Sequence, residues 1–413
     1  MTYRSTAGRT SGRTFEDVVI EGAAADGGLY LPANLPTYEF PSEGSPHAAY
    51  VTRSLEAFGA TDIDGLVEDA FASFNHPEVA PITEIQGHLT LELFWGPTLS
   101  FKDHALQVLG RLFNRYASER GEERTVLVAT SGDTGSAAIA GFRGLGSVRI
   151  VVLFPAGMVT DFQRRQMTTV ADANVTVLSV DGNFDDCQRM VKEAFRSQPG
   201  LASANSINWG RIAAQVGYYM SAAARMGGPF EVVVPTGNFG NAYSAWLARR
   251  LGAPIERIIV ATNANRVLYD LWHKGEVVPS QVAATLAPAM DIQVPSNLER
   301  FLDERPADEF ADEFDAGWAD DETILGTIRH VHDRHGALID PHTAVAWSVS
   351  EQLGESDLPR LIVSTAHPAK FAETIERAIG ITPEVPEWGR IDSSAAERHV
   401  EIEPTLAALQ PHL

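Results

Sequence analysis

The chain of 413 residues carries 54 acidic and 32 basic side chains, for a formal net charge of −22. Hydrophobic residues make up 44% and charged residues 21%, values typical of globular proteins that exclude wholesale disorder. Such an acidic surface repels phosphate backbones and anionic lipids, so we expect neither nucleic acid nor a membrane surface as a partner.

Residues 1 to about 90 form the first unit that the sequence indicates. They lack the apolar stretch of a secretory signal, and no run of 18 apolar residues anywhere predicts a transmembrane helix. Turn-forming residues dominate 24–46, and helical periodicity is present near 50–58 and 62–74. We therefore expect a separate N-terminal domain, followed by a larger region over 91–413.

Beyond residue 91, short β-branched runs each lead through a Gly- or Ser-rich turn into a helical stretch. This repeated unit predicts an α/β fold with parallel sheets that carry helices on both faces. Ligands in such folds bind at the carboxyl ends of the strands, which selects the loops at 131–135, 236–241 and 365–369. Strands are expected at 125–130, 148–154, 175–180, 231–235, 257–262 and 360–365, and helices at 184–196 and 265–273.

Lys102 is one of four lysines in the chain and lies just before an apolar helix, in GPTLSFKDHALQVLGRLF (96–113). A lysine held among apolar neighbours can lose its proton near neutral pH, which Schiff-base chemistry requires. The alternative is a surface residue in the first turn of a helix. The residues alone leave both interpretations open.

The loop in ATSGDTGSAAIA (129–140) follows a strand and begins a helix. Ser131 and Thr134 offer hydroxyl and backbone donors suited to a carboxylate, whereas Asp133 is an acceptor suited to a hydroxyl or an ammonium group. A cluster of N-capping residues explains the same pattern.

A second loop, PTGNFGNA (235–242), also joins a strand to a helix. Gly237 and Gly240 lack side chains, so several backbone N–H groups can converge on an anion at the helix N-terminus. The spacing fits neither a Walker loop nor a dinucleotide fingerprint. A terminal phosphate monoester is the expected ligand, and a tight turn with Asn caps is the alternative.

The acidic segment 303–322 has Phe310, Phe314 and Trp318 at intervals of four residues. This spacing places the three aromatic side chains on one face of a helix. We expect an acidic surface helix packed by its aromatic stripe, with a partner-binding motif as the alternative.

The histidines at 330, 332, 335 and 342 cluster in HVHDRHGALIDPH. No carboxylate or thiol completes a convincing ligand set, so we expect no metal site. Cys187 is the only cysteine and has no basic neighbour to activate it, which indicates a packing role. A single cysteine excludes an internal disulfide and fits a cytoplasmic location.

The last candidate loop, STAHPAKF (364–371), again follows a strand. Ser364 and Thr365 place neutral hydroxyl groups at the carboxyl end of that strand. A capped turn is the alternative interpretation.

Together these segments resemble the threonine synthase family, which uses pyridoxal phosphate and shares a fold with the tryptophan synthase β chain. The resemblance runs from one end of the chain to the other, in the order and spacing of the family. It is carried by ADGGLYLP, GPTLSFKDHALQ, TSGDTGSAA, FPAGMVTDFQRRQM, FDDCQ, NSINWGRI, PTGNFGNA, DPHTAVA and STAHPAKF. The acidic segment 303–322 matches no family motif.

The resemblance implies an α/β structure of pyridoxal-phosphate fold type II. This fold has two parallel-sheet lobes with helices on both faces, plus an N-terminal extension domain over 1–90. The smaller lobe is expected at about 125–200, the larger at about 91–124 and 201–390, and a C-terminal tail at 391–413.

The implied reaction converts O-phospho-L-homoserine and water to L-threonine and phosphate. The enzyme is thus expected to be a carbon–oxygen lyase with a small-molecule substrate, acting as a monomer or homodimer. The alternative is a serine/threonine dehydratase or another pyridoxal-phosphate lyase of the same fold, which would need no basic pocket for a substrate phosphate.

The resemblance also implies roles for individual residues. Lys102 holds the cofactor covalently and is the catalytic base, Thr365 meets the pyridine nitrogen, and Phe101 lies against the cofactor. Further cofactor contacts are expected from Asp133, Gly237, Asn238, Phe239, Gly240 and Asn241. Substrate contacts are expected from Ser131, Thr134, Arg164, Arg165, Asn208 and Arg211, the last four at the substrate phosphate.

Overall fold

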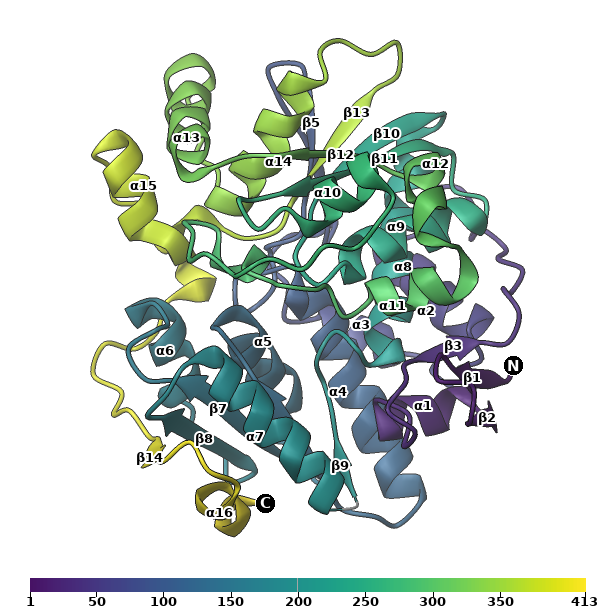
Figure 1. Cartoon of the computed structure of the whole chain (residues 1–413), viewed down its shortest axis with the longest axis vertical. Helices are drawn as coiled ribbons and strands as arrows, with labels where there is room; N and C mark the ends of the chain where they lie inside the picture. The colour runs from purple at the N-terminus through teal and green to yellow at the C-terminus, as the bar shows by residue number, and fades with distance from the viewer. Residues whose placement is uncertain (199) are drawn as a thin grey trace.

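The computed structural model describes residues 1–198 and 200–413, and Figure 1 shows its arrangement. Its strands form a small N-terminal sheet, a larger sheet and a smaller sheet. In Figure 1 the larger sheet occupies the upper half of the molecule and the smaller sheet the lower half, with the N-terminal sheet at one side. No helix in the described part of the chain is long and apolar enough to cross a membrane.

The N-terminal sheet is antiparallel, in the order β2-β1-β3. Thr14 begins α1 with a capping box, its side chain accepting from the Asp17 backbone while Asp17 bonds back, which satisfies two free helix donors. The elements are β1 (Tyr3–Ser5), β2 (Ser11–Arg13), α1 (Phe15–Glu21), β3 (Tyr30–Pro32), α2 (His47–Ala57) and α3 (Leu66–Phe71).

The larger sheet has the strand order β12-β11-β10-β13-β5-β4 and is parallel except for β4, which pairs antiparallel with β5. Its strands are β4 (Ile82–Ile85), β5 (His88–Glu92), β10 (Phe230–Pro235), β11 (Ile255–Thr262), β12 (Asp315–Trp318) and β13 (Arg360–Ser364). Its helices are α8 (Trp209–Met226), α9 (Gly240–Arg250), α10 (Val267–Lys274), α11 (Leu298–Glu304), α12 (Phe310–Glu313), α13 (Asp321–His335), α14 (Pro341–Gln352) and α15 (Ala372–Ile379), with the short turns η1 (Pro288–Met290), η2 (Ala307–Glu309) and η3 (Pro368–Phe371).

The smaller sheet is parallel, in the order β14-β8-β7-β6-β9. Its elements are α4 (Lys102–Glu119), β6 (Arg124–Ala129), α5 (Asp133–Phe142), β7 (Val148–Pro155), α6 (Asp161–Thr168), β8 (Val175–Val180), α7 (Phe184–Ser197) and β9 (Leu201–Ala202). The C-terminal segment adds η4 (Glu387–Gly389), β14 (Val400–Ile402), α16 (Leu406–Leu409) and η5 (Gln410–His412).

In both the larger and the smaller sheet, successive side chains of a strand point to opposite faces and pack into two different hydrophobic clusters. Val232 and Val234 of β10 belong to the main cluster, whereas Val233 between them packs with the helices α13 and α14. In β6, Val126 and Val128 face the main cluster and Leu127 faces α7. Both faces are therefore covered, as the run of apolar residues in these strands predicts.

Most elements of the two sheets match the sequence-based expectation. The six expected strands are confirmed as β6, β7, β8, β10, β11 and β13, and the two expected helices as α7 and α10. Sheet membership differs from the expected division at three strands, one of which is β9, just past the expected end of the smaller lobe but paired with β6 of the smaller sheet. The strand β4 precedes residue 90 yet belongs to the larger sheet, and β14 of the C-terminal segment pairs with β8.

The expectation of one helix over 303–322 is wrong. The chain leaves α11, passes through η2 and α12, and then enters the strand β12. Pro306 cannot continue the preceding helix, and residues 315–318 instead pair in parallel with β11. Phe310 and Phe314 are nevertheless buried, so part of the aromatic stripe does pack inward.

Candidate active site

One cavity of about 290 Å³ lies where the carboxyl ends of β6, β10 and β13 meet. Its lining comes from segments far apart in the sequence: the starts of α4, α5 and α14, the segment 203–211, the loop 235–241, and residues 365, 366 and 371. All three loops that the strand pattern selected contribute to this lining. The position agrees with the rule that ligands of parallel sheets bind beyond the strand ends.

Lys102 is fixed in the cavity by backbone pairing to the loop after β13. The N–H of Phe101 donates to the Thr365 carbonyl at 2.8 Å, and the N–H of His367 donates to the Leu99 carbonyl at 3.0 Å. Leu99 has a φ of 63°, a strained value for a branched residue that the surrounding bonds maintain. This pairing brings Lys102 and Thr365 to the same side of the cavity.

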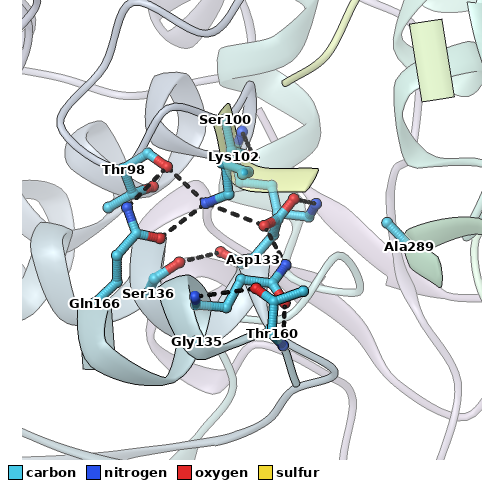
Figure 2. A network of polar contacts seen from close by, with 12 residues as sticks. Thr98, Ser100, Lys102, Asp133, Gly135, Ser136, Thr160, Gln166 and Ala289 are labelled. Carbon is cyan, nitrogen blue, oxygen red and sulfur yellow. Dashed lines mark hydrogen bonds and ion pairs between the residues drawn. The ribbon is translucent and has the colours of Figure 1, made fainter. Parts of the chain in front are cut away.

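The Lys102 amine lies over the Phe101 ring, with Nζ 4.8 Å from its centroid, and 3.3 Å from Oδ2 of Asp133. Figure 2 shows Lys102 and Asp133 within one polar network. Burial lowers the pKa of Lys102, against the opposing charge of Asp133, and the cations Lys370 and Arg211 lower it further. An amine in this setting gives up its proton more readily than an exposed lysine does.

Asp133 remains a carboxylate although it is buried. Burial alone raises the pKa of Asp133, but the charges of Lys370 and Lys102 outweigh it and hold that pKa well below its usual range. Gln163 Nε2 also donates to Oδ1 of Asp133 at 2.8 Å. Asp133 therefore faces the ammonium groups of Lys102 and Lys370, and an ammonium group is one of the two partners that the sequence suggested for it.

The loop 235–242 is closely packed and leads into the N-terminus of α9. A Cβ on Gly237 would overlap the carbonyl oxygen of Ala289 and lie 3.1 Å from Met290 Cα, so only glycine fits here. Phe239 has a φ of 62° and stands at the N-cap of α9. Its ring packs on Phe310 and Phe314, with centroids 5.8 and 5.2 Å apart, so the acidic segment supports this strained backbone.

Asn241 follows this loop with its amide orientation fixed. The hydroxyl groups of Tyr218 and Tyr219 both donate to Oδ1 of Asn241, at 2.5 and 2.7 Å. The amide Nδ2 is consequently left buried, with no hydrogen-bond partner among the described residues. An unpaired buried donor is costly, which indicates that a ligand acceptor completes it.

The cavity is basic, in contrast to the whole chain. Lys102, Lys192 and Arg211 line it, and Asp133 is the only acidic residue among the described lining residues. Arg211 is buried, forms no ion pair with any carboxylate in the described ranges, and has its Nε without a partner. Burial lowers the pKa of Arg211 to about 10. These groups suit an anionic ligand.

Three family models match the chain. The model of pyridoxal-phosphate dependent enzymes covers residues 83–360, the model of the threonine synthase N terminus covers 2–50, and the model of the threonine synthase C-terminal region covers 343–412. The chain is also 39% identical to a threonine synthase of Pseudomonas aeruginosa, over 94% of this chain and 92% of that protein. The chain belongs to the threonine synthase family.

Other members of the threonine synthase family agree in sequence and structure. Threonine synthase of Escherichia coli is 36% identical over 90% of each chain. The crystal structure of the pyridoxal-phosphate-bound threonine synthase of Brucella melitensis superposes with a TM-score of 0.93 at 36% identity, covering 100% of this chain and 98% of that one. The yeast threonine synthase structure gives a TM-score of 0.91 at 31% identity, covering 100% and 97%.

The residues of this threonine synthase family member fit pyridoxal phosphate. The glycine loop leaves room that a Cβ would fill, the Asn241 amide lacks an acceptor, and a buried amine faces the same cavity. These are groups for a phosphate at one end of a ligand and an aldehyde at the other. Pyridoxal phosphate is the cofactor of the family, and the expected fold type is confirmed by the solved members.

The structure brings most of the expected site residues together. Those that line the cavity are Phe101, Lys102, Ser131, Asp133, Thr134, Arg211, Gly237, Asn238, Phe239, Gly240, Asn241 and Thr365. Three others lie elsewhere. Arg164 and Arg165 pair with Glu397, and Asn208 caps α8 while donating to the carbonyl groups of Val19 and Ser203. That any of these three contacts substrate stays a prediction, without support from the position of its side chain.

Some lining residues were not singled out by the sequence. His342 accepts from the Ala289 N–H through Nε2 and lies 2.7 Å from Asp340 at Nδ1, although its sequence context indicated an ordinary helix histidine. Gln188 and Lys192 of α7 also line the cavity. Gln188 ends the family motif FDDCQ, which gave it no assigned role, and the spacing around Lys192 shows only an amphipathic helix.

Proposed function

We propose that this cavity converts O-phospho-L-homoserine and water to L-threonine and phosphate, with Lys102 as the residue that moves protons. One observation carries the proposal: a buried amine of lowered pKa lies in a basic cavity of an otherwise acidic protein. A phosphorylated amino acid needs such a local reversal of charge, because the rest of the surface repels it.

The cavity lining and the family resemblance together support the cofactor contacts. Pyridoxal phosphate, when bound, supplies an electron sink for negative charge that develops on the amino acid. The backbone N–H groups of 237–240 and the Asn241 amide hold its phosphate at the start of α9, where the helix dipole favours negative charge. Lys102 would hold its aldehyde, Phe101 would lie against its ring, and Thr365 would offer a neutral hydroxyl to its ring nitrogen. A neutral partner there would favour the unprotonated nitrogen and a weaker electron sink.

Lys102 moves the protons at Cα and Cβ of the substrate. A general base works best when its pKa lies near the working pH, and burial moves the pKa of Lys102 in that direction. The Asp133 carboxylate, 3.3 Å from Nζ, orients the amine and stabilises its protonated form between transfers.

The substrate's two acidic ends bind at opposite sides of the cavity. The donors of Ser131 and Thr134 at the start of α5 hold the carboxylate, because hydroxyl groups and a helix N-terminus favour that charge. Arg211 and Lys192 bind the phosphate of the substrate. The buried guanidinium of Arg211 then gains the anionic partner that it lacks within the described chain.

The proposal includes a cytoplasmic location. Cys187, the single cysteine, is buried and free, and burial raises the pKa of its thiol to about 12. Such a thiol is unreactive, in keeping with the packing role that the sequence indicates.

The test is phosphate release from O-phospho-L-homoserine by the wild-type chain and by Lys102→Ala. We expect wild-type turnover, at least a thousandfold loss in Lys102→Ala, and unchanged turnover in Lys274→Ala, a change at an exposed lysine of α10. Turnover at the wild-type rate in Lys102→Ala would refute the role of Lys102. Ammonia release from threonine without phosphate release from O-phospho-L-homoserine would favour the dehydratase alternative.

A further inference from the structure

A second buried lysine lies behind the active site. Lys370 belongs to η3, and its side chain is completely buried. Its Nζ is 2.6 Å from the Thr98 carbonyl, 2.9 Å from Oε1 of Gln166 and 3.1 Å from Oδ1 of Asp133. An ammonium group has three N–H donors, so each has one acceptor. The mechanism above gives this residue no task.

Lys370 and Lys102 share one carboxylate. Lys370 lies against Oδ1 of Asp133, and Lys102 lies 3.3 Å from Oδ2 of the same side chain. Thr98, Gln166 and Asp133 converge in the network drawn in Figure 2, which links the segment before α4 with α5 and α6. Lys370 reaches this network from the larger sheet, so it connects the two lobes at the reacting amine.

The charges of this cluster determine whether the Lys102 amine can stay unprotonated beside the Asp133 carboxylate. When Lys102 is neutral, Asp133 would be a buried carboxylate without a counter-ion unless another cation remained. A lone buried charge is strongly unfavourable, and Asp133 would then draw a proton back to Lys102. Lys370 supplies the missing cation at a fixed distance.

We propose that Lys370 is a positioning residue that serves as the permanent counter-ion of Asp133 and thereby lets the Lys102 amine give up its proton. The inference rests on the proposed function, in which Lys102 acts as a base. It accounts for two lysines around a single buried carboxylate, in a chain that has only four lysines.

The surrounding charges agree with this role. Burial lowers the pKa of Lys102, Asp133 raises it, and Lys370 with Arg211 lowers it again. The Lys370 charge also lowers the pKa of Asp103, which burial raises to about 6. The titratable and charged groups that face the cluster are Lys102 and Asp103 of α4, Asp133 of α5, Arg211 of α8, His342 of α14, and His367 and Lys370 at η3.

The small number of lysines makes a direct test possible. Lysine labelled with ¹³C at Cε gives four NMR signals in the full-length chain freed of its cofactor, and each signal reports its own titration. We expect Lys370→Met, which keeps length but removes the charge, to raise the pKa of Lys102 by at least about one unit. Lys370→Arg, which keeps the positive charge, should leave the pKa of Lys102 within about 0.3 units of its wild-type value. Lys274→Met removes an exposed lysine, assigns one signal and should change nothing.

An unchanged titration of Lys102 in folded Lys370→Met would overturn the proposal, because a purely structural lysine lowers the melting temperature without moving that titration. If Lys370→Met does not fold, a second charge-removing variant decides. Lys370→Gln, which also removes the charge but keeps a polar side chain, then takes its place, and an unchanged Lys102 titration in that variant refutes the counter-ion role. Loss of the proposed function is detected separately, by phosphate release in Lys102→Ala.

Discussion

Gly237→Ala should weaken cofactor binding through a single methyl group. The added Cβ overlaps the Ala289 carbonyl oxygen and comes within 3.1 Å of Met290 Cα, whereas non-bonded carbon atoms prefer about 3.5–4.0 Å. Either the loop 235–242 or the η1 turn must therefore move by roughly half an ångström to one ångström. A displacement of about 1 Å costs on the order of a hundredfold in a preorganised site, so we expect cofactor affinity to fall at least about tenfold.

The assay is absorbance titration of the cofactor-free chain with pyridoxal phosphate, giving Kd for each variant. Gly326→Ala is the matched control, because Gly326 lies inside α13 and nothing stands within 4 Å of its added Cβ. The control should bind like the wild type and gain about 0.5–1 kcal/mol of stability from its helix position. Wild-type affinity in Gly237→Ala, or equal losses in both variants, would show that close packing at Gly237 does not shape the phosphate site.

Two further predictions concern the substrate phosphate and acid stability. Arg211→Met should raise KM for O-phospho-L-homoserine about 10- to 100-fold, which is the effect of losing one charge-assisted hydrogen bond. Arg164→Met should leave KM unchanged, because Arg164 pairs with Glu397 outside the cavity. Steady-state kinetics with the reverse pattern would place the phosphate site elsewhere. Burial lowers the pKa of His104 to about 3 in the folded chain, whereas a histidine in the unfolded chain has a pKa near 6.5. Between these two pH values the unfolded chain therefore binds more protons than the folded chain. The free energy of unfolding must then fall as the pH drops from about 6.5 toward 3. Urea unfolding should show that His104 accounts for roughly 2 kcal/mol of the loss between pH 7 and pH 5, and His104→Leu should lack that part; parallel pH dependences would contradict the assignment.

The sequence predicts the central strands well because burial on both faces leaves an unambiguous apolar run. Each of β6, β10 and β13 is such a run followed by a turn, and the turns become the three ligand loops. The short strands are a different case. β12 and β14 have no run of their own and exist because a longer neighbour offers hydrogen bonds. Their formation depends on tertiary contacts that no local window contains.

The site residues also differ in whether a local sequence pattern or the tertiary packing brings them to the cavity. Lys102, Gly237 and Asn241 lie in segments whose local pattern already indicates a turn before a helix. Lys192 reaches the site only through the packing of α7, whereas His342 and Lys370 lie in recognised motifs that give no indication of where their side chains point. Arg164 is the converse case: it lies in a family motif, but its side chain pairs with Glu397 of the C-terminal segment. A match to a family motif does not give the direction of a side chain, which depends on the tertiary structure around it.

The pairing of β14 with β8 has a consequence for biosynthesis. Val400–Ile402 lie beside Leu178–Val180, so the ribosome makes the two strands on the order of two hundred residues apart. At about 5–20 residues per second, the outer edge of β8 waits roughly 10–45 seconds for its partner. Exposed strand edges invite pairing with other chains. The smaller lobe is thus most open to aggregation while the larger lobe is still being translated, and that interval is when a chaperone would protect it.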